Sequence, residues 1–423
     1  MTLYLRDAQW LDPADFSMNR VHLAVDEGPF GNASPVDSIP PGAKTLDCKG
    51  RLVTRSFACG HHHIYSALAR GMPPAPKAPR NFTEILEYVW WRLDKCLDRD
   101  MIEASAQAAA LACAKNGVTF VIDHHASPNA IPGSLETIAR AFEKVGIGHL
   151  LCYETSGRDG KDAALAGLAE TDAYLSKGRK GHVGLHASFT VDDELLESAV
   201  ALAGKHGAGI HIHAAEDMAD QELSLRYHAK RVIHRLKDAG VLDLPRTILA
   251  HCVHLDEEER AMVRDSTAWV VQNAESNLNN AVGVTGYADF GPRVMLGTDG
   301  MHSDMLRSAQ AAYLVGQKTE GLSPLAAYRR FRAVHAHIAG TGAPGDSGNN
   351  LVVLDYDSPT PVTKDNFPGH FAYGLTSRHV SAVVAQGRVI VEDGRLVSAG
   401  EGAILSFARE QAERLWARLE EAR

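Results

Sequence analysis

Short apolar runs that end in polar residues recur along the middle of the chain, and a longer amphipathic stretch follows each one. Eight such runs occupy residues 51–63, 117–127, 146–156, 181–190, 207–216, 246–255, 267–277 and 292–300. They are apolar on both faces, which is typical of parallel strands that helices cover. The intervening stretches, such as residues 101–115 and 193–206, are long enough to be crossover helices. The pattern predicts an α/β fold with a (β/α)₈ TIM-type barrel over residues 55–344.

The two ends of the chain have a different pattern, with shorter β-like runs that proline and glycine interrupt. Such runs occur in residues 1–54 and again in residues 345–423. Because the ends of a compact chain often lie close together, we predict one smaller β-sandwich domain composed of both termini. Residues 401–423 carry an apolar stripe at helical spacing, so a final helix is expected there. This helix either packs on the body of the protein or contacts a second copy.

Composition narrows the class of protein but names no substrate. Of the 423 residues, 45% are hydrophobic and 22% are charged, which is typical of a globular chain. No apolar run is long enough for a membrane span, and the first residues lack a secretory pattern, so a cytoplasmic protein is expected. The formal net charge of −9 disfavours nucleic acid as a partner and leaves a small-molecule substrate. Six scattered cysteines predict reduced, buried thiols.

Polar residues gather where the predicted strands end. They are His61, His63, His124, His125, His186, His213, Glu216, His251, Asn277 and Asp299. In a (β/α)₈ barrel the carboxyl ends of the strands meet on one face, and active sites lie there. The distribution therefore predicts one active site at this end of the barrel.

The run His61-His62-His63 has the spacing of a metal site on a strand. Successive side chains of a strand alternate faces, so His61 and His63 point together and can hold one ion. His335 and His337 have the same spacing in a predicted helix, where two positions are about 200° apart and cannot share an ion. The spacing therefore indicates a metal site only in the strand.

The fifth and eighth predicted strands supply further ligands. His213 lies nearer the strand end than His211, so we predict His213 as a ligand and His211 as a packed barrel histidine. Asp299 ends the eighth strand and adds a carboxylate. Three histidines and one carboxylate leave a position for water, as in catalytic sites. One divalent metal is expected, zinc first and iron as the alternative, because the ligands suit both.

Two further residues supply acid–base chemistry beside this metal. A bound divalent ion lowers the pKa of water and so generates hydroxide as a nucleophile. His251 and Asp299 are predicted to manage the proton of that water, and Glu216 is predicted to carry a proton to the substrate nitrogen. The alternative for Glu216 is a helix N-terminal carboxylate, and for His251 a core histidine.

Four segments in this order resemble the deaminase and chlorohydrolase branch of the amidohydrolase superfamily. They are GHHH (60–63), IHIHAAE (210–216), LAHCVHL (249–255) and LGTDG (296–300). The resemblance covers nearly the whole chain. It implies a single metal, usually zinc and sometimes iron, with glutamate as the acid and base. It also implies a homodimer or a higher homo-oligomer.

Further segments are similar to the SsnA group of aminohydrolases, which is associated with selenium metabolism. These include HHHIYSALARG (61–71), IDHHASP (122–128), QNAESNLNNAVG (272–283) and TDGMHSDM (298–305). The resemblance implies that His186 contacts the substrate, with His125 and Arg70 as further substrate-binding candidates. Asn279 and Asn280 replace the Lys-Leu that is usual at this point in the branch.

We therefore predict a metal-dependent hydrolase that deaminates an amino-substituted heterocycle, such as a purine, pterin or triazine-like ring. One alternative is hydrolysis of a cyclic amide, an N-alkyl amine or a halide at the same site. Another is a non-catalytic metal-binding accessory protein of selenium or molybdenum metabolism. The proline-rich stretch 72–80 is either a surface loop or a functional loop over the pocket.

Overall fold

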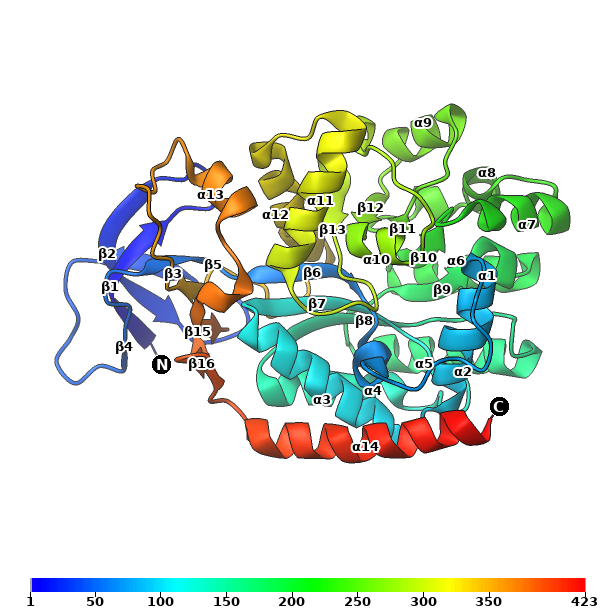
Figure 1. Ribbon diagram of the computed structural model, residues 1–423, viewed down its shortest axis with the longest axis horizontal. Coiled ribbons are helices and arrows are strands. Elements are labelled where there is room, and N and C mark those ends of the chain that lie inside the picture. Colours follow the sequence, from blue (N-terminus) through cyan, green and yellow to red (C-terminus); the bar gives the residue numbers. More distant parts are fainter. Residues whose placement is uncertain (1, 423) are drawn as a thin grey trace.

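The computed structural model describes residues 2–422, and its α/β part contains two parallel sheets (Figure 1). The strands are β6 (Phe57–His62), β7 (Val118–His125), β8 (Gly148–Tyr153), β9 (Val183–Ala187), β10 (Ile210–Ala214), β11 (Ile248–His251), β12 (Trp269–Gln272) and β13 (Val294–Leu296). One sheet has the order β6-β7-β8 and the other β13-β12-β11-β10-β9. Isolated parallel bridges join the two sheets: His62–Asp299 at one junction, and Leu151–Gly181 and Thr155–Leu185 at the other. Each of the eight predicted runs contains one of these strands.

The first predicted run is two strands rather than one. β5 (Leu52–Arg55) pairs with β14 (Leu351–Leu354) in the terminal sheet, whereas β6 pairs with β7. Between the two strands, the backbone N–H of Ser56 donates to the carbonyl of Asn350, and its hydroxyl lies 2.6 Å from that of Thr119. Both strands are mostly buried and apolar, so the pattern of the sequence does not reveal the change of partner.

Helices follow the parallel strands along the chain. They include α3 (Arg99–Lys115), α4 (Ser134–Val145), α5 (Lys161–Ser176), α6 (Asp193–His206), α7 (Met218–His228), α8 (Val232–Asp238), α9 (Glu257–Asp265), α10 (Ala274–Asn279), α11 (Met305–Glu320) and α12 (Pro324–Thr341). Local signals set their ends. In α6, the Asp192 side chain accepts from the N–H of Leu195, and Gly207 closes the helix with a φ of 58°.

The predicted helical pair His335 and His337 lies in α12, and its two rings have different partners. His335 Nδ1 lies 2.9 Å from an Asp346 carboxylate oxygen, whereas His337 Nε2 lies 3.2 Å from His182 Nε2. The two histidines therefore do not share a site, as their helical spacing predicts.

Both termini contribute to one terminal sheet. Its strands are β1 (Thr2–Leu11), β2 (Met18–Asp26), β3 (Ala33–Val36), β4 (Thr45–Asp47), β5, β14, β15 (Val380–Ala385), β16 (Arg388–Glu392) and β17 (Arg395–Leu396). Leu5, Val25, Val53, Val353 and Val384 form part of its apolar core. The short helix α13 (Phe367–Tyr373) lies between β14 and β15 in the chain.

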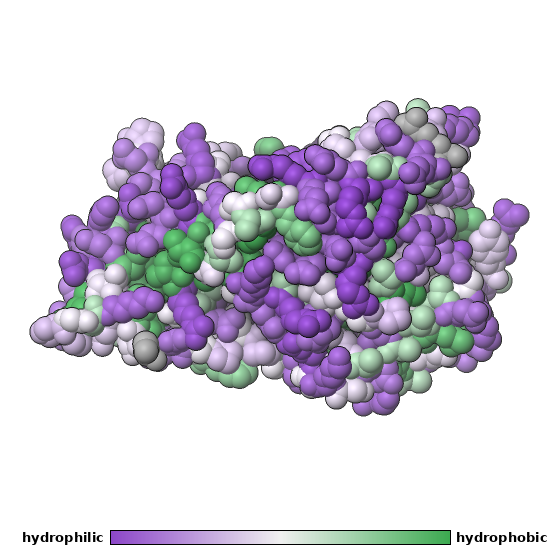
Figure 2. Space-filling model, turned by 90° about the horizontal axis from the view of Figure 1, so that it is seen from below, coloured by the Kyte–Doolittle hydropathy of each residue, from purple (hydrophilic) through white to green (hydrophobic). Residues whose placement is uncertain are grey.

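The last helix, α14 (Glu401–Glu421), packs along α3 (Figure 1). It buries Ile404, Leu415 and Leu419, and the Trp416 indole N–H donates to the carbonyl of Leu68 over 2.9 Å. The molecular face on this side is mainly hydrophilic (Figure 2). Packing on the body of the protein is thus confirmed, and contact with a second copy stays a prediction. Among the described residues, no helix has the length and apolar character to cross a membrane.

Candidate metal centre and active site

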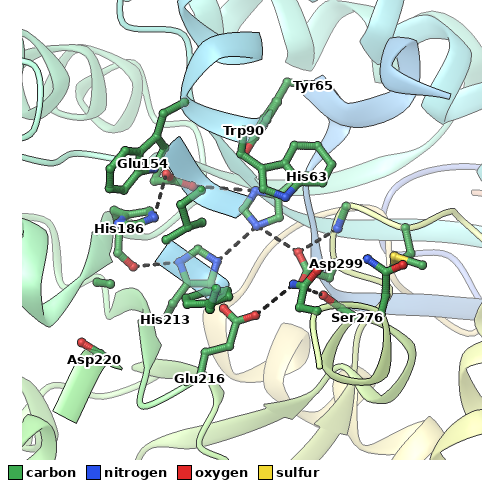
Figure 3. Close-up of a pocket in the computed structure, with 18 of the residues that line it drawn as sticks. His63, Tyr65, Trp90, Glu154, His186, His213, Glu216, Asp220, Ser276 and Asp299 are labelled. Atoms are coloured by element: carbon green, nitrogen blue, oxygen red, sulfur yellow. Dashed lines mark hydrogen bonds and ion pairs between the residues drawn. The ribbon is translucent and has the colours of Figure 1, made fainter. Parts of the chain in front are cut away.

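The predicted ligands meet at the carboxyl ends of three strands, and Figure 3 shows three of them, His63, His213 and Asp299, around one point. His61 and His63 lie at the end of β6, His213 lies near the end of β10, and Asp299 follows β13. Nε2 of His63 is 3.2 Å from Nε2 of His213 and 3.2 Å from Oδ1 of Asp299. Nε2 of His61 is 3.7 Å from the same Asp299 oxygen. The structure therefore brings together all four residues that the sequence singled out.

Hydrogen bonds fix which nitrogen of each ring faces this point. Nδ1 of His63 donates to the carbonyl of His124 over 2.6 Å, and Nδ1 of His213 donates to the carbonyl of His186 over 2.7 Å. Each Nδ1 therefore carries the proton, so each Nε2 presents a lone pair. Two facing lone pairs repel each other unless a proton or a metal ion lies between them.

His61 adds a third nitrogen of this kind. Its Nδ1 lies 2.9 Å from Nε2 of His211, a fully buried histidine of β10. Its Nε2 is buried and has no hydrogen-bond partner among the described residues. Burial lowers the pKa of both His61 and His213 well below the ordinary value, so the neutral form that binds metals is favoured. The donor set fits a divalent metal.

A neighbouring cluster also has the spacing of a metal site, but one of its members has no free lone pair. His63, His124, Glu154 and His213 each offer an atom within 4.8 Å of the others. Burial opposes protonation of His124, but Cys152 and Glu154 outweigh burial and raise its pKa well above the ordinary value. Its Nδ1 lies 3.0 Å from Glu154, and its Nε2 donates to the carbonyl of His211 over 3.1 Å. His124 is therefore a hydrogen-bond donor on both sides.

His251 and Glu216 lie beside the four ligands. Nδ1 of His251 donates to Oδ1 of Asn277 over 2.7 Å, so its Nε2 is the basic nitrogen. That nitrogen is 3.4 Å from Oε2 of Glu216 and 3.7 Å from Oδ2 of Asp299. His251 has a φ of 72° and Asp299 a φ of 53°, values that non-glycine residues seldom adopt. Backbone strain of this kind clusters at functional sites.

Glu216 and Asp299 have different pKa values because their surroundings differ. Burial raises the pKa of Glu216 to about 7, which suits a group that gains and loses a proton near neutral pH. Burial also opposes ionisation of Asp299, but the adjacent His63 and His251 outweigh it and lower its pKa. Glu216 Oε1 accepts from the Asn280 side chain over 3.3 Å. One carboxyl is therefore suited to carry a proton and the other to stay ionised.

The other predicted substrate contacts fall in different places. His186 lines the pocket, and its Nδ1 lies 2.8 Å from the Thr190 hydroxyl. His125 is fully buried outside the lining, with its Nε2 2.9 Å from the Ser127 hydroxyl. Arg70 is exposed and borders a separate groove beside α3 and α14. The structure therefore brings His186 to the metal centre but neither His125 nor Arg70.

Glu154 lines the pocket, although it is not among the site residues that we predicted from the sequence. It follows β8 directly, and its carboxylate lies 3.8 Å from Nδ1 of His63 and 3.9 Å from Nε2 of His186. Burial opposes its ionisation, but His186 and His124 outweigh burial and hold its pKa well below the ordinary value. The strand-end rule that selected the histidines also applies to Glu154, because it lies near the end of the third predicted run, 146–156, directly after β8.

An aromatic wall of the pocket was also missed. The segment α1 (Phe82–Ile85), a π-helical turn (Leu86–Trp90) and α2 (Trp91–Cys96) supply Phe82, Trp90 and Trp91 to the lining. The proline-rich stretch 72–80 leads into this segment. Its first residues border a separate recess with Tyr88 and Leu419. Repeated aromatic residues at 82, 88, 90 and 91 are the available signal in the sequence.

Comparison with known proteins matches this site and fold. Residues 52–390 match the amidohydrolase family. A 5-methylthioadenosine/S-adenosylhomocysteine deaminase from Pelotomaculum thermopropionicum is 27% identical over 419 residues, which cover 93% of each chain. A 5'-deoxyadenosine deaminase from Methanopyrus kandleri is 29% identical, over 90% of this chain and 89% of that protein.

Two solved structures share the fold. An adenosine deaminase from Xanthomonas campestris with bound zinc has a TM-score of 0.82 at 16% identity, over 98% of each chain. The atrazine chlorohydrolase TrzN from Arthrobacter aurescens, in complex with zinc, has a TM-score of 0.82 at 19% identity, over 97% of this chain and 100% of that one.

Because the family match spans most of its length, the chain belongs to the amidohydrolase family. The predicted likeness to deaminases and chlorohydrolases is confirmed, as is a hydrolase that acts on carbon–nitrogen bonds. The names of the relatives support hydrolytic deamination as the reaction.

Proposed function

We propose that the chain is a hydrolytic deaminase of an amino-substituted heterocycle, such as a purine, pterin or triazine-like ring. One divalent metal, zinc first, is held by His61, His63, His213 and Asp299. The observation that carries the proposal is the convergence of three imidazole nitrogens and one carboxylate, with the Glu216–His251 pair 3.4 Å apart beside them. A site that only stores metal requires no such acid–base pair.

The reaction adds water to the ring carbon that bears the amino group. A bound divalent ion lowers the pKa of water, so that hydroxide is available near neutral pH. Glu216, whose pKa is about 7, donates a proton to the ring nitrogen as the carbon becomes tetrahedral. The added hydroxyl then passes its proton to the amino nitrogen, the carbon–nitrogen bond breaks, and ammonia leaves behind a ring carbonyl. The first proton of the attacking water replaces the proton that Glu216 gave to the ring.

His251 and Asp299 handle the proton of the water. The Asn277 side chain keeps the proton of His251 on Nδ1, so Nε2 accepts a hydrogen bond or a proton. Asp299 has one oxygen toward His61 and His63 and the other toward His251. One carboxylate can therefore contact both the ligand cluster and the reacting water. His186 is proposed to contact the ring, and His125 and Arg70 stay predictions.

The fold that carries this site is proposed to be a closed eight-stranded barrel over residues 55–344. The bridge between His62 and Asp299 and the bridge between Leu151 and Gly181, at the two junctions of the parallel sheets, support closure. The bulged nine-stranded terminal sheet supports a composite sandwich of residues 1–54 and 345–423.

The experiment is an ammonia-release screen of the metal-loaded protein against purines, pterins and triazines, repeated with Glu216→Gln. We expect Glu216→Gln to bind metal normally but to release ammonia at least about a hundredfold more slowly, because an acid–base group is lost. Glu222→Gln, an exposed change in α7, is the matched control. Full turnover by Glu216→Gln disproves the acid–base role. A ring-opened acid without ammonia disproves deamination.

A further inference from the structure

The aromatic wall of the pocket comes largely from one helical segment. Phe82, Leu86, Trp90 and Trp91 line it, and Phe189 joins them from a turn after β9. The π-helical turn Leu86–Trp90 adds a residue to the helical repeat, which allows both adjacent tryptophans to reach the pocket. Rings arranged in this way bind a flat apolar or aromatic group by stacking.

Outside the aromatic wall, the only side chains of the described lining that carry a full charge when ionised at neutral pH are four carboxyl groups. They are those of Glu154, Glu216, Asp220 and Asp299. All four carboxyl side chains are buried, and the carboxylates of Glu154 and Asp299 lie 3.8 Å and 3.2 Å from nitrogens of His63. An anionic substituent would therefore meet buried acidic groups and no lysine or arginine among the described lining residues.

Arg158 is a cation close to this wall, but it is already paired. Its guanidinium lies 5.2 Å from the Trp91 ring centroid. It contacts the Asp94 carboxylate and lies 3.1 Å from Asp159. The Arg158 side chain is 7% exposed, so a ligand anion would have to displace a buried carboxylate to reach it. Nη1 of Arg158 has no hydrogen-bond partner among the described residues, but the side chain does not line the pocket, and its charge is balanced by Asp94 and Asp159.

We propose that this pocket selects an uncharged aminated heterocycle with a flat, apolar or aromatic substituent, and that it discriminates against substrates with a phosphate or carboxylate. The proposal rests on the proposed function for the identity of the reacting ring. The discrimination itself follows from the lining, because an added negative charge would meet buried carboxyl groups without a lysine or arginine to pair with.

Paired ligands test this proposal by equilibrium binding to zinc-loaded Glu216→Gln protein, measured by calorimetry. The pairs are adenosine with adenosine 5'-monophosphate, pterin with pterin-6-carboxylate, and an amino-triazine with its carboxymethyl derivative. We expect the neutral member of at least one pair to bind, and each anionic partner to bind at least about tenfold more weakly. Equal or tighter binding of an anionic partner, or no binding of any neutral ring, overturns the proposal.

Ammonia release by the wild type, measured in parallel, separates this proposal from the proposed function. Binding of neutral rings without ammonia release retains the selectivity and disproves deamination. A second variant tests the wall itself. Trp91→Leu should lower the affinity for a neutral ring with an aromatic substituent by about tenfold. Trp10→Leu in the terminal sheet should leave that affinity unchanged. Unchanged affinity in Trp91→Leu contradicts the role of the wall.

Discussion

Histidines at this site differ in chemistry because their hydrogen-bond partners differ. Backbone carbonyls take the Nδ1 protons of His63 and His213 and leave Nε2 free for a metal. His124 donates from both nitrogens, so it is closed to metal. His251 has a side-chain partner, Asn277, which leaves one basic nitrogen toward Glu216. The same residue type thus supplies ligands, a structural donor and a base.

The partner of His251 gives a prediction at this scale. Asn277→Leu removes the acceptor for Nδ1, so the imidazole loses its fixed tautomer, and we expect kcat to fall by about tenfold to a hundredfold with metal content unchanged. Asn277→Asp keeps an acceptor and should restore most of the activity. If Asn277→Leu and Asn277→Asp are equally active in the ammonia assay, the tautomer argument is wrong.

Asp220 gives a prediction about pH and stability. Burial raises its pKa from 3.8 to about 7, and its Oδ2 accepts from the Ala215 N–H. The folded state therefore binds the proton of the Asp220 carboxyl more tightly than the unfolded state does. The contribution of this proton to the free energy of unfolding is present below about pH 4 and is lost as pH rises to about 7. The loss amounts to at most about 4 kcal/mol.

Asp220→Asn should remove this loss, because the amide does not ionise. Urea unfolding at several pH values measures the difference between wild type and variant. We expect Asp220→Asn to gain stability relative to the wild type as pH rises, and the exposed change Asp243→Asn to follow the wild-type curve. A constant difference between Asp220→Asn and the wild type at all these pH values would show that Asp220 does not titrate in the window.

At the scale of elements, the positions of the parallel strands could be predicted from the sequence, but the pairing of each strand with its neighbours was harder to predict. Buried parallel strands leave a strong apolar signal, and each predicted run contains a strand. The change of sheet at Ser56 left no signal, because β5 and β6 are both mostly buried and differ only in their neighbours. The repeated aromatic residues at 82–91 are visible in the sequence, but their location is not, since a helix after a proline-rich loop can lie on many surfaces. Only tertiary packing brings Trp90 and Trp91 to the site.

The docked helix α14 gives a prediction about stability. Leu415 is fully buried where α14 packs on the body of the protein. Leu415→Ala leaves a cavity there, and we expect the free energy of unfolding to fall by about 2–5 kcal/mol. Glu413→Ala, two residues earlier on the exposed side of the same helix, should change it by less than about 0.5 kcal/mol. Equal midpoints in chemical unfolding would show that α14 adds little to the folded body.

At the scale of the whole molecule, the ligands come from segments far apart in the chain. Residues 61, 213 and 299 meet only because parallel strands direct their carboxyl ends to one face. This is why the four ligands could be predicted from strand ends, and Glu154 could have been found in the same way. The substrate could not be predicted in this way, because its selection depends on the side chains that helices and loops contribute to the pocket lining.

The most direct test of the account is elemental analysis of the metal bound per chain, after identical purification of the wild type, His63→Asn and His234→Gln. His234 lies in α8 on the surface, 3.8 Å from Glu258, and is the matched control. We expect close to one divalent ion per chain in the wild type and in His234→Gln, and almost none in folded His63→Asn. Equal metal content in His63→Asn and the wild type would contradict it.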